Sequence, residues 1–130
     1  MPATITMRVD SRHSKAIAWA MKLPGGAKAL VEERKIRSYL LNLEHPDGLA
    51  KARFFMSRGY RADDWGKLAD DLRRHGLQNE VVGTVGSPHG MRYAVDGLLR
   101  TPSGKSIRLI TVWIIEKGTE VPRLVTAYPA

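Results

Sequence analysis

A histidine and a lysine stand six residues apart in the first half of the chain, and both could act on a phosphate group. His45 lies in a predicted loop, and Lys51 lies in the first turn of the helix that follows. An imidazole can exchange a proton near neutral pH, and an ammonium group can neutralise phosphate charge. The alternative is that His45 satisfies backbone groups of its loop and that Lys51 is a solvated helix charge.

Three hydroxyl groups and a guanidinium group form a second set, on the last two predicted strands. Thr111 lies on the first of these strands, and Arg123, Thr126 and Tyr128 lie on the second. Neighbouring antiparallel strands bring side chains within about 5 Å of each other. Strict alternation places Thr126 and Tyr128 on one face, where they can share a site with Thr111. Arg123 joins that face only through a bulge or from the strand end. Thr and Tyr are also common sheet formers, which is the alternative.

The charge of the chain favours a polyanionic partner without proving one. The 130 residues carry 21 basic and 13 acidic side chains, a net charge of +8. Residues 1–77 hold 15 basic and 9 acidic side chains and residues 78–130 hold 6 and 4, so most of the excess lies in the first part. We therefore expect two basic residues of this part, Lys35 and Arg53, to help bind a substrate.

Several classes of protein are excluded or disfavoured by composition. The absence of cysteine rules out a disulfide framework, a thiolate zinc site and a cysteine nucleophile. No histidine pair has metal-ligand spacing, and no phosphate-loop glycine pattern precedes a helix, so we expect neither a metal nor a cofactor. No apolar stretch is long enough to span a bilayer, and residues 1–10 lack the apolar block of a secretory signal. We expect a cytoplasmic protein without membrane attachment.

Apolar spacing predicts helices in the first part of the chain. A short helix is compatible with residues 13–23. After the acidic pair Glu32 and Glu33, a helix should present Ile36, Tyr39, Leu40 and Leu43 as one buried stripe. A second helix is predicted from about Leu49 to Arg58, ending at Gly59. Asp63 should cap a third, whose Trp65, Leu68, Ala69 and Leu72 repeat the same spacing before Gly76 ends it.

From Asn79 onward the apolar period changes to two, which predicts strands. Val81, Gly83 and Val85 alternate with Val82 and Thr84, and turns are predicted at 87–90, 101–104 and 117–119. The run from Ile107 to Ile115 is apolar on both faces, which suggests a central strand covered on both sides. A last strand is predicted over Arg123–Tyr128, bracketed by prolines.

We therefore predict an α+β fold in which N-terminal helices pack on a C-terminal four-stranded antiparallel β-meander. We expect one domain over residues 21–130. Residues 1–20 should be an extension outside this domain. The extension could form a strand over residues 4–9, form a helix, or be frayed. The oligomeric state cannot be predicted from these patterns.

Many residues resemble a bacterial family, the domain of unknown function 6883. The first part of the match is carried by Leu23-Pro24, Lys35, Tyr39-Leu40-Leu41, His45-Pro46, Gly48, Lys51-Ala52, Phe55 and Gly59. The second part is carried by Gly90, Tyr93, Thr111-Val112-Trp113-Ile114 and the run from Val121 to Tyr128. The resemblance covers residues 22–129. It brings a family label and no activity.

A more distant likeness is to the metal-independent ribonucleases grouped around barnase, EndoU, the tRNA-cleaving colicins and RelE. That likeness implies helices packed on an antiparallel sheet, with a site of one histidine or lysine and late-strand polar residues. By topology these positions would be His45, Lys51, Thr111, Thr126 and Tyr128. The chain departs from the group because it has no strand glutamate where barnase needs one and no late histidine of the EndoU kind.

The sharpest functional hypothesis is a toxin-like domain that cleaves RNA with the 2′-hydroxyl as nucleophile and without a metal. His45 would be acid or base, Lys51 and Arg123 would stabilise charge, and Thr126 with Tyr128 would position the phosphate. Two alternatives stay open. One is a noncatalytic module of a two-gene pair with a small cognate partner protein, and the other is an RNA-binding domain without cleavage.

Overall fold

The computed structural model describes residues 21–130. The predictions of a strand over residues 4–9, of most of a helix over residues 13–23 and of a terminal extension concern residues outside this range. Within it, helical elements come first and four strands follow. The predicted α+β fold with a C-terminal antiparallel meander is therefore confirmed.

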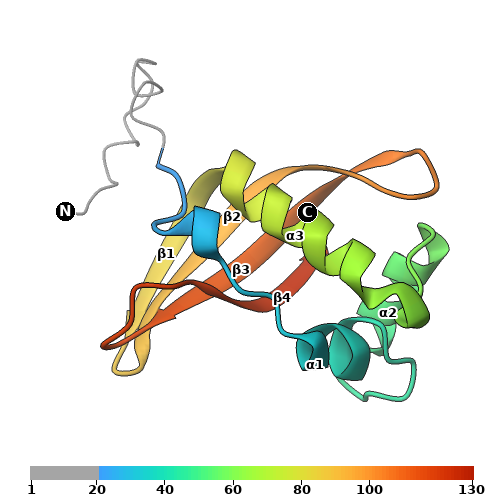
Figure 1. Cartoon of the computed structure of the whole chain (residues 1–130), viewed down its shortest axis with the longest axis horizontal. Helices are drawn as coiled ribbons and strands as arrows, with labels where there is room; N and C mark the ends of the chain where they lie inside the picture. Colours follow the sequence, from blue (N-terminus) through green and yellow to red (C-terminus); the bar gives the residue numbers. More distant parts are fainter. Residues whose placement is uncertain (1–20) are drawn as a thin grey trace.

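The helical elements occupy the first part of the described chain. A short turn of helix, η3, spans Gly26–Lys28. The larger elements are α1 (Glu33–Lys35), the π-helix η4 (Ile36–Leu40), α2 (Leu49–Ser57), the short helix η5 (Ala62–Asp64) and α3 (Trp65–Gln78). In Figure 1, α3 crosses one face of the sheet while α1 and α2 lie beyond one end of it.

The first predicted helix is shorter than its apolar stripe suggests. It begins as expected beside Glu33, but changes after Lys35 into a π-helix in which the amide of Leu41 donates to the carbonyl of Ile36. The helix ends at Leu40, and Leu43 is left exposed. Spacing alone could not predict this change, because the α and π forms share their first turn and differ only in which carbonyl accepts.

Helix α3 follows the predicted spacing, but its beginning differs, and it continues past the predicted stop at Gly76 to Gln78. Leu68, Ala69 and Leu72 are buried, as the period of 3.6 requires. Asp63 does not cap the helix; its carboxylate instead accepts two hydrogen bonds from the guanidinium group of Arg61, at 2.9 and 2.7 Å. A neighbouring arginine therefore competes successfully with the backbone amides for this carboxylate.

The strands are β1 (Glu80–Ser87), β2 (Gly90–Arg100), β3 (Ser106–Glu116) and β4 (Arg123–Pro129). They are antiparallel and lie in the order β1-β2-β3-β4. The segment at Leu30 lies along the outer side of β4, where its amide donates to the carbonyl of Pro122 and its carbonyl accepts from Leu124. Strand β3 is thus central, as predicted.

A bulge in β4 decides which side chains share a face. Thr126 lies opposite Val112 and Leu124 lies opposite Trp113, so Val125 is an extra residue. Arg123 consequently faces the same side as Thr126 and Tyr128. The bulge is one of the two ways in which the sequence allowed Arg123 to join that face. We call this side, which α3 does not cover, the open face.

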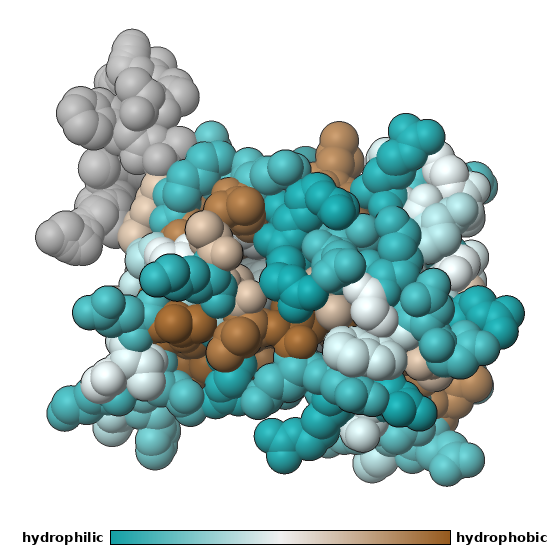
Figure 2. All heavy atoms as spheres, viewed as in Figure 1, coloured by the Kyte–Doolittle hydropathy of each residue, from teal (hydrophilic) through white to brown (hydrophobic). Residues whose placement is uncertain are grey.

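The face under α3 holds most of the core. Leu109, Trp113 and Val95 are fully buried there with Leu68 and Leu72 of α3. The prediction that β3 is covered on both sides is wrong for part of the strand: on the open face Ile110 and Val112 are only half-buried, although Ile114 is buried. Figure 2, which views the α3 side, shows a mainly hydrophilic surface with smaller apolar areas.

Among residues 21–130, no helix is long and apolar enough to cross a membrane.

Candidate functional site

Tyr39 is the centre of the polar cluster that the helical part brings to the sheet. It lies in η4, and π-helical turns occur frequently at functional sites. Gly48 packs directly on it: a Cβ atom at Gly48 would stand 2.6 Å from the Tyr39 carbonyl oxygen and 2.9 Å from its ring. The loop before α2 can therefore approach Tyr39 only because residue 48 has no side chain.

Two lysines and a histidine surround the Tyr39 ring. The ammonium nitrogen of Lys35 lies 5.4 Å from the ring centroid and that of Lys51 lies 5.6 Å from it. The His45 ring meets the phenol edge-on, with centroids 5.0 Å apart. A cation within about 6 Å of an aromatic face is attracted to it. We call Lys35, Tyr39, His45 and Lys51 the Tyr39 cluster.

Backbone bonding limits what His45 can do. The amide of Asp47 donates to Nδ1 of His45 at 3.0 Å. A nitrogen that accepts a hydrogen bond carries no proton, so the neutral ring has its proton on Nε2. In this conformation His45 is a hydrogen-bond donor through Nε2, and accepting a second proton would require breaking the bond to Asp47.

Tyr39 links this cluster to the open face of the sheet. Its hydroxyl lies 3.2 Å from Oγ1 of Thr126 on β4, a contact that joins residues far apart in sequence. Arg123, on the same strand and face, contacts two carboxylates, Glu116 at 2.5 Å and Glu32 at 3.6 Å. The arginine is thereby fixed beside the end of α1.

Lys35 is influenced both by Tyr39 and by the charged groups around Arg123. Burial lowers the pKa of Lys35 below its ordinary value, and the guanidinium groups of Arg123 and Arg34 lower it further. The Tyr39 phenol and the carboxylate of Glu32 oppose this shift. Lys35 is therefore easier to deprotonate than a solvated lysine.

The remaining predicted residues lie at different distances from this centre. Tyr128 is 37% exposed, two residues beyond Thr126 on the open face. Arg53 is exposed on α2 and makes no ion pair or hydrogen bond within the described chain. The structure thus gathers His45, Lys51 and Lys35 around Tyr39, joins them to Thr126, and leaves Arg53 on the surface.

Thr111 does not belong to this cluster, so the prediction from strand alternation that it shares a site with Thr126 and Tyr128 is wrong. It lies opposite Ala127 rather than beside Thr126, and it is fully buried under α3. Its hydroxyl accepts from Nε1 of Trp113 at 2.8 Å and lies 3.0 Å from Nδ1 of His75. Because of the β4 bulge, Thr126 and Tyr128 lie on the open face while Leu124 lies on the α3 side. Thr111 is also on the α3 side and is therefore a core residue.

His75 is also a structural group, and it is buried between α3 and the sheet. Its Nε2 lies 3.1 Å from the carbonyl oxygen of Gly97 and 2.9 Å from that of Leu109. Two carbonyl acceptors require the proton on Nε2, so Nδ1 accepts from Thr111. Burial lowers the pKa of His75, against the effect of the two carbonyl contacts.

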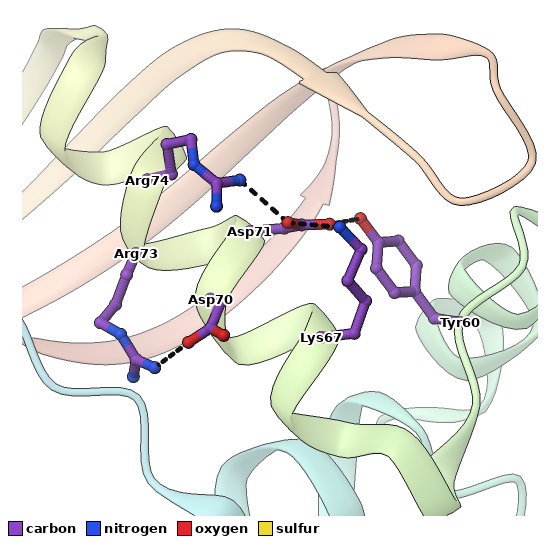
Figure 3. A network of polar contacts seen from close by, with 6 residues as sticks. All are labelled: Tyr60, Lys67, Asp70, Asp71, Arg73 and Arg74. Carbon is purple, nitrogen blue, oxygen red and sulfur yellow. Dashed lines mark hydrogen bonds and ion pairs between the residues drawn. The ribbon is translucent and has the colours of Figure 1, made fainter.

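A second buried polar group stabilises α3 without belonging to the cluster (Figure 3). The carboxylate of Asp71, 1% exposed, accepts from the Tyr60 hydroxyl at 2.7 Å, from Lys67 at 3.1 Å and from Arg74 at 3.0 Å. Burial and the bond to Asp71 raise the pKa of Tyr60 far above its ordinary value. The Tyr60 hydroxyl therefore stays protonated at neutral pH and donates to this carboxylate.

A polar cavity of about 270 Å³ lies elsewhere, between the end of α3 and the start of β1. Its lining carries two basic side chains, Lys22 and Arg108, and two acidic ones, Glu80 and Asp96. Arg108 makes two bonds of 3.0 Å to Asp96, and Lys22 donates to the carbonyl of Gln78. We give this cavity less weight than the Tyr39 cluster because its charges neutralise one another. Across residues 21–130, no three side chains of the metal-binding types gather.

Sequence reasoning missed the residue at the centre. Tyr39 was assigned to the buried stripe because its spacing fits Ile36 and Leu40, and it does pack against the core. A tyrosine with lysines four residues before it and twelve after it carried no recognisable motif. The carboxylates of Glu32 and Glu116, which hold Arg123, were missed because no spacing connects them.

Comparison with known proteins supports a family and a fold. Residues 22–130 match the family described as Domain of unknown function (DUF6883), as the resemblance predicted. A chain of the "Contact-dependent growth inhibition toxin - immunity protein complex from Klebsiella pneumoniae 342" is similar in structure, with a TM-score of 0.61 and 18% identity. The similarity covers 81% of this chain and 96% of that one. At this identity it shows a shared fold. No curated protein sequence matches.

Proposed function

This chain belongs to the family of Domain of unknown function (DUF6883), and from the Tyr39 cluster we propose that it is a toxin-like domain that cleaves RNA without a metal. The observation that carries the proposal is the convergence of two ammonium groups and an imidazole on one phenol beside the sheet. A phosphodiester is the ligand whose charge and geometry this donor set suits.

The donors of the cluster fit the charge that develops during cleavage. Attack by the 2′-hydroxyl oxygen forms a bond to phosphorus, and the bond from phosphorus to the 5′-oxygen breaks. The intermediate phosphorane carries extra negative charge. Lys51 and Nε2–H of His45 can stabilise it from the loop side, because fixed donors cost no reorganisation during the reaction.

The proton transfers are assigned to groups other than His45. Lys35 in its neutral form would accept the proton of the 2′-hydroxyl, since its lowered pKa makes that form more accessible. The Tyr39 hydroxyl would give its proton to the departing 5′-oxygen, and the Lys51 ammonium group facing the ring would stabilise the phenolate. The products are a 2′,3′-cyclic phosphate and a free 5′-hydroxyl.

Arg123 keeps the phosphate-binding role predicted for it, and Thr126 takes a different role from the predicted one of positioning the phosphate. Thr126 would hold Tyr39 through their 3.2 Å contact, and Arg123 would bind the phosphate from the sheet side. Arg53 is proposed only as an outer charge that attracts RNA. These roles extend the cluster onto the open face.

The test is cleavage of total RNA by the purified chain in the presence of a chelator. We expect fragments from the wild type and a loss of about 100-fold or more in rate for Tyr39→Phe and for Lys35→Gln, the usual contribution of a general acid or base. His45→Ala should lose less, because it removes one donor. Intact RNA with the wild-type chain would refute the proposal.

A charge-matched control separates catalysis from bulk electrostatics. Arg73 lies on α3, on the other side of the sheet, and contacts Asp70. Arg73→Gln removes the same charge as Lys35→Gln and should cleave at the wild-type rate. Equal losses for the two variants would show that net charge, and not the cluster, determines activity.

A second candidate is a noncatalytic module that binds a small cognate protein. It is favoured by one observation, the naming of an immunity protein beside the toxin in the structurally similar complex. Expression of this chain alone and together with the product of an adjacent gene tests it. If the two proteins co-purify stably and the wild-type chain leaves RNA intact, the result favours this candidate over the enzyme.

A further inference from the structure

The open face of the sheet carries two arginines in one row across the strands. Arg92 of β2 lies opposite Ile114 of β3, and Ile114 lies opposite Arg123 of β4. Alternation puts all three on the same face. Neighbouring strands are about 4.8 Å apart, so the two arginines start about 10 Å from each other.

Both arginines are accessible from the open side. Arg92 is exposed and makes no ion pair within residues 21–130. Arg123 is fixed by Glu116 and Glu32, yet a guanidinium group has five N–H donors, so these contacts leave donors for a further anion. The row therefore places the guanidinium group of Arg92 and the remaining donors of Arg123 side by side on the open face, beside the Tyr39 cluster.

An aromatic ring stands on the same face. Tyr128 lies opposite Ile110 and is 37% exposed, although large aromatic side chains are usually buried in a domain core. Between Tyr128 and Arg123 lies Thr126, which contacts Tyr39. On β4, the Tyr128 ring and the Arg123 cation thus lie on either side of Thr126, which touches the candidate site. Arg92 adds a second cation on β2.

We propose that the open face binds single-stranded RNA, with a base stacked on Tyr128 and backbone phosphates at Arg123 and Arg92. This assignment rests on the proposed function for its choice of RNA and names the substrate class as unpaired strands. Bases in a duplex are stacked on each other and cannot reach a ring on a flat sheet, whereas unpaired bases can.

The test is fluorescence anisotropy with a labelled 2′-O-methyl oligoribonucleotide, which the proposed reaction cannot cut because its 2′-oxygen is blocked. We expect Tyr128→Leu and Arg92→Ala each to weaken binding by about 5-fold or more, the lower end for a lost stacked base. Tyr128→Phe should bind almost as the wild type. Arg92→Ala should also lower the salt dependence by about one phosphate contact.

Controls keep the surface distinct from charge and folding effects. Arg73→Ala, on the α3 side, should bind as the wild type, and a duplex of the same sequence should compete poorly. Circular dichroism checks that Tyr128→Leu is folded. Arg92→Ala tests the same face with little risk of misfolding, because Arg92 is exposed. Unchanged binding by both open-face variants would overturn the assignment.

The outcomes also separate this inference from the proposed function. Binding that depends on Tyr128 and Arg92 without cleavage of ordinary RNA supports the surface and refutes the enzyme. Cleavage that is insensitive to both substitutions supports the enzyme and refutes the surface. No binding of the oligoribonucleotide even at low salt overturns the RNA assignment and favours a protein partner on this face.

Discussion

The pKa of Lys35 depends on its burial and on its charged neighbours. Burial and the nearby guanidinium groups of Arg123 and Arg34 lower its pKa. Removing one positive neighbour should therefore raise that pKa toward the ordinary lysine range, since a like charge disfavours the ammonium form. We expect Arg123→Gln to raise the pKa of Lys35, measured by NMR titration of the lysine side chains.

Glu32 provides the opposing control for that titration. Its carboxylate favours the charged form of Lys35, so Glu32→Gln should lower the same pKa. A Lys35 titration that moves in the same direction in both variants would contradict this account of the electrostatics.

Residue types alone could identify part of the site. His45, Lys35 and Lys51 were predicted from their chemistry, and the structure brings them together around Tyr39. Tyr39 itself could not be predicted, because an aromatic residue at a core spacing looks like any other. Nor could the donor role of His45, which depends on the amide of Asp47.

At the scale of elements, α3 and the sheet are held in contact at Gly76. A Cβ atom at this position would lie 2.6 Å from the Trp113 ring, which is fully buried. We expect Gly76→Ala to destabilise the protein by about 1–3 kcal/mol, because an overpacked core must shift. Chemical denaturation measures the change.

Gly66 is the matched control in the same helix. A Cβ atom there meets nothing within 4 Å, so Gly66→Ala should stabilise the protein by about 0.5–1 kcal/mol through helix propensity. Destabilisation of similar size in both variants would argue against the close packing of α3 on Trp113.

The Asp71 network should contribute more than its neighbour on the same helix. Asp71→Ala leaves the buried Tyr60 hydroxyl without its acceptor and separates Lys67 and Arg74 from their carboxylate. We expect a loss of about 3 kcal/mol in the free energy of unfolding. Asp70→Ala, which breaks an exposed pair with Arg73, should cost at most about 1 kcal/mol. Equal losses would contradict the role of burial.

The order and approximate limits of the elements could be predicted because period and turn residues agree. The change from a period of 3.6 to a period of two after Asn79 separates the helices from the strands. The β4 bulge and the π-helix could not be predicted, since each depends on which backbone groups pair in three dimensions. These two irregularities place Arg123 and Tyr39 at the site.

At the scale of the whole molecule, stability should fall in mild acid through His75. Its pKa in the folded state is below the unfolded value of about 6.5, so between the two values the unfolded chain binds more protons. The stability it contributes is therefore present above about pH 6.5 and is lost as pH falls through the folded pKa. Thermal melting from pH 7.5 to pH 5 measures this loss.

Substitution of His75 tests whether its imidazole causes the loss of stability in acid. His75→Gln should be less stable at neutral pH and should lose part of the decline in acid. His89→Gln, at an exposed turn, should keep the whole decline. A decline of wild-type size in His75→Gln would exclude His75 as its source.

The central claim is that the Tyr39 cluster joins a 2′-oxygen to phosphorus. Its most direct test is one oligoribonucleotide, cut by the wild-type chain in chelator, compared with the same strand carrying a single 2′-deoxy nucleotide at the cut position. The account predicts that the ordinary strand yields a 2′,3′-cyclic phosphate end, that the substituted strand stays whole there, and that Tyr39→Phe cuts neither. Cleavage at the 2′-deoxy position would contradict it.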